Sequence, residues 1–260
     1  MKAVYYLVTL KKQKTIIGLR KRIRFIFLFL IFVSAHTGLL GQKQKPKNES
    51  WYDEKLLHFG FSIGFNTMDF NITPSPYCLD PDSVDSYPYP EVAMLKPGIN
   101  IQIVTNLRPS RYFDIRFLPG VSFGQRIVRY YKDTVLYNSH QRLESSYLEF
   151  PLLLKYKGER LNNVRPYVIS GLNFRYDLAA KKEFDEERPV YIRIKKPDLY
   201  FEAGAGLDFY LKYFKLSVEL KMSSGMSNII VDDFVSGQEE FRNSIERMRS
   251  QIWIIAFHFE

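Results

Sequence analysis

Ten ionisable side chains stand at alternate positions within segments that are otherwise apolar or small. Neighbouring carboxylates can work as a general acid and base, whereas carboxylates beside cations can form buried ion pairs. Five of the ten are basic and five are acidic, so we predict that they neutralise one another inside the fold and have a structural role. This lumen charge network comprises Arg116, Arg126, Lys155, Arg175, Lys221, Glu149, Asp177, Glu202, Asp208 and Glu219.

Other candidates for catalysis are sparse. His58 and Ser62 share one face of an alternating segment, but four residues along a strand span about 13 Å, which is beyond hydrogen-bond reach. No glycine-rich phosphate loop precedes a helix, and no His/Cys cluster has metal-ligand spacing. The one cysteine, Cys78, cannot form an internal disulfide. We therefore expect no catalytic, cofactor-binding or metal-binding residues.

The elements that carry these charges read as β-strands. In residues 146–178, Phe150, Leu152 and Leu154 share one parity, while Glu149 and Lys155 occupy the other. This period of two continues on both sides of a short polar turn at 158–163, as in a β-hairpin. Each arm is about ten residues long, which suits a tilted transmembrane strand.

Six further segments alternate in the same way. They are residues 57–65, 98–107, 113–127, 199–209, 214–222 and 251–259. With the two arms of the 146–178 hairpin they make eight strands. Pro119 predicts a bulge or bend within the third strand.

The connections between the eight strands are alternately short and long. We expect tight turns at 108–112, 158–163 and 210–213, and long loops at 71–97, 129–145, 179–198 and 223–250, the last with a short helix at 238–249. This asymmetry is typical of short periplasmic turns and long external loops. The sequence thus predicts an all-β, eight-stranded antiparallel up-and-down transmembrane β-barrel.

The polar face of the strands distinguishes this barrel from a soluble one. A lipocalin also has eight strands, but its apolar side faces inward. Here the apolar side must face lipid, because isolated charges in a dry core would cost several kcal/mol each. Since side chains fill an eight-stranded lumen, we expect a plugged barrel.

The N-terminus has the parts of a secretory signal. Residues 1–41 contain eight basic residues, no acidic residue and the apolar run FIFLFLIFV. The rest of the chain carries 29 basic and 28 acidic residues, so eight of the nine net positive charges belong to the signal, and the charge does not indicate nucleic-acid binding. We predict a signal peptide at 1–41, cleaved after Ala35 or Gly41, a periplasmic linker at 42–55, and an outer-membrane β-barrel domain at 56–260.

Three segments resemble one known family. FDIRFLPGVSFGQR (113–126), ESSYLEFPLLLKYKGERLNN (144–163) and RPYVISGLNFRYDLA (165–179) are similar to the PorT family of Bacteroidota. The resemblance extends over essentially all of the mature chain. It implies an integral outer-membrane barrel of the type IX secretion system, needed for export and maturation of secreted proteins and in some species for gliding motility. The family has no known catalytic residues to place on this sequence.

The expected partners are therefore outer-membrane lipid and other type IX secretion components. Two alternatives remain open: a stand-alone outer-membrane barrel with an adhesive or structural role, and a lipid-modifying barrel enzyme. Lost export of several unrelated cargo proteins after gene deletion would distinguish the secretion role from the first alternative.

Overall fold

The computed structural model describes residues 48, 52, 54–78, 88–92, 96–132, 135–180, 192–232 and 239–260. They belong to one of two compact units of the chain, Lys47–Glu260. The predicted signal peptide and both of its cleavage points lie outside the described residues. Of the predicted linker at 42–55, four residues are described.

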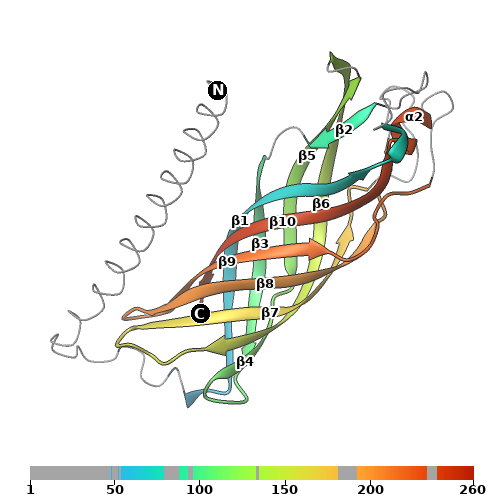
Figure 1. Ribbon diagram of the computed structural model, residues 1–260. Helices are drawn as coiled ribbons and strands as arrows, with labels where there is room; N and C mark the ends of the chain where they lie inside the picture. The colour runs from blue at the N-terminus through green and yellow to red at the C-terminus, as the bar shows by residue number, and fades with distance from the viewer. Residues whose placement is uncertain are drawn as a thin grey trace, which may run out of the picture. The chain divides into compact units, whose positions relative to one another are not determined.

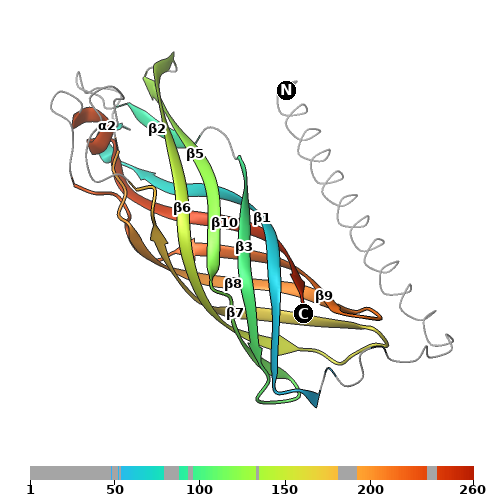
Figure 2. The same ribbon diagram turned by 180° about the vertical axis from the view of Figure 1, so that it is seen from behind.

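A single antiparallel sheet closes on itself. β1 pairs with both β3 and β10, and every other strand of the ring pairs with its two neighbours. β4 and β5 together occupy one position, between β3 and β6, so the ring has eight strands, as predicted (Figures 1 and 2). The ring consists of β1 (Leu57–Pro74), β3 (Pro97–Leu107), β4 (Phe113–Phe117) with β5 (Gly120–Lys132), β6 (Val135–Lys157), β7 (Val164–Asp177), β8 (Pro197–Tyr210), β9 (Lys215–Gly225) and β10 (Ile245–Phe259).

The interruption between β4 and β5 has a local cause. Pro119 has no N–H to donate to a ladder, and its carbonyl oxygen accepts a hydrogen bond from the Ile103 amide at 2.9 Å. On the other side of the break, the Leu118 amide donates to the carbonyl oxygen of Pro151 in β6 at 3.1 Å. The bend predicted at Pro119 is thus present, and the neighbouring strands stay connected across it.

Side chains alternate between the outside and the inside of the ring. The outward positions carry large apolar residues such as Phe150, Leu154 and Ile255, which are 44%, 50% and 47% exposed. The inward positions of β6 and β7 include Glu149, Lys155 and other buried polar groups. Water would disfavour so much exposed apolar surface, whereas lipid would not.

The inner wall is more apolar than the sequence predicted. β10 turns Trp253 and Ile255 outward, but it also turns Ile252 and Ile254 inward, so both of its faces are apolar. The two inward isoleucines pack with Met68 and with the rings of two tyrosines, Tyr147 and Tyr200.

The two ends of the ring differ as expected. The tight turns lie at one end, the short-turn mouth, where Asn162 adopts φ 57°, a left-handed conformation that Asn tolerates well. Among the described residues, no helix has the length and apolar character to cross a membrane.

Two predictions for the opposite end, the long-loop mouth, were wrong in extent. Much of the loop predicted at 129–145 is strand, because β5 and β6 continue pairing past the rim (Figure 2). β5 also pairs with the short strand β2 (Tyr89–Val92). The helix predicted at 238–249 is only α2 (Glu239–Asn243), because β10 begins at Ile245.

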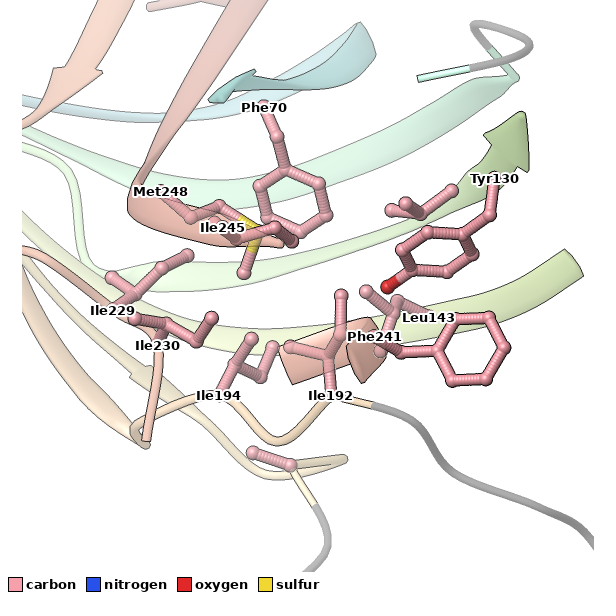
Figure 3. Packing of buried hydrophobic residues seen from close by; sticks show 12 residues of the cluster. Phe70, Tyr130, Leu143, Ile192, Ile194, Ile229, Ile230, Phe241, Ile245 and Met248 are labelled. Carbon is pink, nitrogen blue, oxygen red and sulfur yellow. The ribbon is translucent and has the colours of Figure 1, made fainter. Parts of the chain in front are cut away.

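An apolar group, the mouth cluster, closes the long-loop mouth. It draws on β1, β5, β6, β10, α2 and the segments around Ile194 and Ile230, which form a β-bridge with each other (Figure 3). Burial of these side chains excludes water from that end of the lumen. The mouth cluster comprises Phe70, Val128, Tyr130, Leu143, Ala180, Ile192, Ile194, Ile229, Ile230, Phe241, Ile245 and Met248.

Candidate functional site

All ten residues of the lumen charge network lie inside the barrel. Each is at most 1% exposed. Strand parity explains this, since inward positions recur every second residue. Their contacts divide most of them between two ionic clusters.

The first group, the Arg175 cluster, joins Arg175, Glu149, Glu202 and Lys221. Arg175 lies 2.9 Å from Glu149 through Nε and 3.0 Å from Glu202 through Nη2. The Lys221 ammonium is 2.9 Å from the other oxygen of Glu202. Two cations thus face two carboxylates, so the net charge of the cluster is zero.

Neutral donors complete the Arg175 cluster. The Gln102 amide and the Ser122 hydroxyl each donate to Glu149 at 2.7 Å. Asn173 and Ser223 donate to Glu202 at 2.8 Å and 3.0 Å. A buried ion pair is tolerable only when such bonds satisfy the remaining lone pairs, so these residues are part of the site.

The second group, the Arg116 cluster, joins Arg116, Lys155, Lys215, Asp208, Glu219 and Glu260 near the short-turn mouth. Arg116 bridges Glu219 at 3.2 Å and Glu260 at 3.0 Å. Lys155 lies 2.8 Å from Asp208, and Lys215 lies 2.8 Å from Glu260. Three cations face three carboxylates.

Aromatic and small residues let the Arg116 cluster fill its space. The Tyr167 hydroxyl donates to Glu219 at 2.9 Å, and its ring lies 3.6 Å below the ammonium of Lys155, a cation–π contact. The opposite position must be glycine, because a Cβ on Gly206 would lie only 2.5 Å from the Tyr167 ring.

Two members of the predicted network are not ion-paired with any described residue. Arg126 donates to the Tyr147 hydroxyl at 2.9 Å and lies over the Phe70 ring at 4.1 Å. Asp177 accepts backbone N–H bonds from Ser146 and Ala179. Both residues therefore lie next to the mouth cluster, outside the two ionic clusters.

Sequence reasoning missed several members of these groups. Lys215 and Asp114 stand at inward parity, so the alternation could have found them; Asp114 forms an ion pair with Lys157. Glu260 follows the last predicted strand, where the pattern gives no signal.

Tyr52 occupies the short-turn mouth of the barrel. Its ring stacks on His58 with centroids 3.9 Å apart and meets Tyr210 edge-on at 6.0 Å. Its hydroxyl donates to Glu260 and accepts from the Lys215 ammonium at 2.8 Å. Burial, and then the nearby Glu260 carboxylate, raise the pKa of Tyr52 far above its usual value.

Asn48 fixes the chain just before Tyr52. Its backbone N–H donates to the Asn163 side chain at 2.9 Å, and its amide donates to the Tyr210 carbonyl oxygen at 3.1 Å. Its carbonyl oxygen accepts a hydrogen bond from Arg160. The region predicted to be a linker without regular pattern is therefore anchored here to two tight turns.

Among the described side chains, His258 is not hydrogen-bonded to a serine as a nucleophile–base pair would be. His258 stands opposite Ser62 on β1 and Ser217 on β9, and its Nε2 lies 3.4 Å from Glu219. Neither ring nitrogen has a hydrogen-bond partner among the described residues, and Ser217 donates to Asp208 at 2.6 Å instead. Within the described residues, no group of His, Cys, Asp and Glu could hold a metal ion.

Several solved structures, outer membrane proteins among them, resemble this chain. OprG from Pseudomonas aeruginosa is 14% identical with a TM-score of 0.46, over 77% of this chain and 93% of that one. AlkL in lipid bilayers is 13% identical with a TM-score of 0.40, over 84% and 94%. Ail of Yersinia pestis is 11% identical with a TM-score of 0.33, over 77% and 96%. No curated protein sequence matches this chain.

A family match covers most of the chain. The family described as the outer membrane protein beta-barrel domain matches residues 41–231. The match agrees with the closed eight-stranded ring and the apolar outer wall, and it supports a location in the outer membrane. In outer-membrane barrels the short turns generally face the periplasm. The chain belongs to the outer membrane protein beta-barrel domain family.

Proposed function

We propose that this barrel is a non-enzymatic component of the type IX secretion system that supports export and maturation of secreted proteins. The observation that carries the mechanism is the filled lumen. The Arg116 and Arg175 clusters and the mouth cluster occupy successive levels of it. Because the lumen is filled, cargo would not pass through the barrel. The barrel would instead act by binding other proteins at its two mouths.

The secretion role itself is supported by the resemblance of residues 113–126, 144–163 and 165–179 to the PorT family. These segments form most of β4, β5, β6 and β7. They contribute Arg116, Glu149 and Arg175 to the lumen and the break at Pro119 to the wall. The expected partners are other secretion components, which would meet the periplasmic turns or the external rim.

The test is deletion of the gene followed by complementation. Loss of several unrelated cargo proteins from the cell surface, restored by the wild-type gene, is the expected result. Purification of the barrel in mild detergent should then bring other secretion components with it. Unchanged export of all cargo after deletion would reject the proposal.

A matched allele tests the absence of catalysis. Ser62→Ala removes the hydroxyl that stands opposite His258 and should restore export as fully as the wild type, with lipid A and phospholipid unchanged. Failure of this allele to restore export, while the barrel is folded, would favour the enzyme alternative.

The second candidate function is a stand-alone barrel with an adhesive or structural role. The observation that favours it is the β5–β6 hairpin, which continues past the rim and presents β2 beyond it. Such a barrel would leave export intact after gene deletion and would change surface attachment or envelope integrity instead.

A further inference from the structure

Tyr52 lies where the barrel would otherwise open to the periplasm. It contacts the inward residues His58, Tyr210, Lys215 and Glu260, which come from β1, β8, β9 and the end of β10. These four strands are consecutive in the ring, and β1 is far from the other three in the sequence. One side chain from outside the sheet thus joins them across the mouth.

The contacts of Tyr52 reach the ionic lumen directly. Its hydroxyl bonds with Glu260, and Glu260 in turn bridges Lys215 and Arg116. The Lys215 ammonium also lies 4.3 Å from the centre of the Tyr52 ring. The phenol therefore covers the outermost ion pair of the Arg116 cluster and separates it from water.

The contacts that hold Tyr52 at the mouth can be released without unfolding the barrel. Tyr52 and Asn48 are held by side-chain hydrogen bonds, a ring stack and cation–π contacts, and neither residue pairs with a strand of the ring. Withdrawal of Tyr52 would break none of the ladder bonds between the ring strands. The barrel wall can therefore persist with the plug in or out.

We propose that Tyr52 is a removable plug that controls access from the periplasm to the Arg116 cluster. Withdrawal of Tyr52 would expose Lys215 and Glu260 to water. The Arg175 cluster would stay sealed, because it lies further along the strands and keeps all its partners. This inference does not depend on the secretion role.

The test compares two buried serines on β9. Ser217 donates to Asp208 in the Arg116 cluster, and Ser223 donates to Glu202 in the Arg175 cluster. Both are 0% exposed, and they lie about 20 Å apart along the strand. Each is replaced by cysteine in a Cys78→Ser background, and reaction with a small charged methanethiosulfonate is timed on the folded barrel in detergent.

Tyr52→Ala should accelerate labelling of Ser217→Cys at least tenfold and leave Ser223→Cys unchanged. Tyr52→Phe, which keeps the ring, should give an intermediate rate. Equal labelling of Ser217→Cys with and without Tyr52 would overturn the proposal, and so would equal acceleration at both cysteines, which would indicate general loosening. Retained heat-modifiable migration on gels establishes that each variant is folded. If Tyr52→Ala does not fold, the Tyr52→Phe and Asn48→Ala variants carry the same comparison.

Discussion

Glu202 is the residue on which the Arg175 cluster depends most. It pairs with both Arg175 and Lys221 and accepts from Asn173 and Ser223. Neutralising it leaves Lys221 buried with no described carboxylate at ion-pair distance. Removal of one partner from a buried pair typically costs about 3–5 kcal/mol.

Glu202→Gln should therefore lower the free energy of unfolding by about 3 kcal/mol, measured by urea titration of the barrel in lipid or detergent. The exposed Glu159 in the β6–β7 turn is the matched control, and Glu159→Gln should change stability by less than about 0.5 kcal/mol. Adding Lys221→Met to Glu202→Gln should recover part of the loss. If the double variant is no better than the single one, the two charges are not coupled.

The raised pKa of the Tyr52 phenol predicts how stability depends on pH. Its pKa in the folded protein is raised by burial and then by the Glu260 carboxylate, whereas an unfolded tyrosine titrates near about 10. The stability that this group contributes is thus fully present below that unfolded value and is lost as the pH rises above it. Between pH 9 and 11, wild type should lose more stability than Tyr52→Phe in urea titrations. Identical slopes for the two proteins would contradict the buried position of the hydroxyl.

The sequence identified which residues face the lumen but not which of them form ion pairs with one another. Parity alone places Arg126 and Glu149 inside. The partners depend on the register between strands, which brings Arg175 opposite Glu149 and leaves Arg126 with Tyr147 and Phe70. Glu260 lies beyond the alternating segment, and Tyr52 reaches the lumen from a segment without periodicity.

Among the elements, the described segment of the β7–β8 connection that begins at Ile192 is held to β6 by one side chain. Gln141 in β6 donates to the Ile192 carbonyl oxygen at 2.8 Å and accepts from the Ile192 amide at 2.8 Å. The amide side chain thus replaces a neighbouring strand for that residue. This bond pair holds Ile192 in the mouth cluster, beside Ile194, which the β-bridge to Ile230 holds.

Gln141→Ala should loosen that segment without opening the ring. It leaves two buried backbone groups of Ile192 without partners, at a cost of about 1–3 kcal/mol each. Hydrogen–deuterium exchange should show faster uptake in the peptide that contains Ile192, with β7 and β9 unchanged. Gln125→Ala, which removes only a surface contact with Glu144, is the control and should show no change at Ile192.

Strand positions were predictable because lipid and lumen impose opposite chemistry on the two faces. All eight expected segments coincide with strands of the ring, and the tight turns fall where they were expected. The lengths of the strand ends that continue beyond the membrane were not predictable. There β5 pairs with both β6 and β2, and beyond the membrane neither face meets lipid, so strict alternation is not required.

For the molecule as a whole, the lumen is sealed in three stages by different forces. Tyr52 covers the short-turn mouth, ion pairs fill the levels behind it, and apolar packing closes the long-loop mouth. Charge balance within each ionic cluster removes most of the cost of burying its members. The outer wall needs no such balance, because lipid is its solvent.

This arrangement predicts that the barrel does not conduct ions. The side chains of Arg175, Glu202 and Arg116 are 0% exposed, so no continuous path of water passes them, and an ion entering the lumen would have to displace paired charges. In planar bilayers the wild-type barrel should give no stable conductance steps, whereas an open sixteen-stranded porin, used as the positive control, should conduct. Tyr52→Ala should be equally silent, because the Arg175 and mouth clusters remain closed behind the plug. Reproducible steps of uniform size from the folded wild type would contradict the filled lumen, and transport through the barrel would then replace recognition at its mouths as the mechanism.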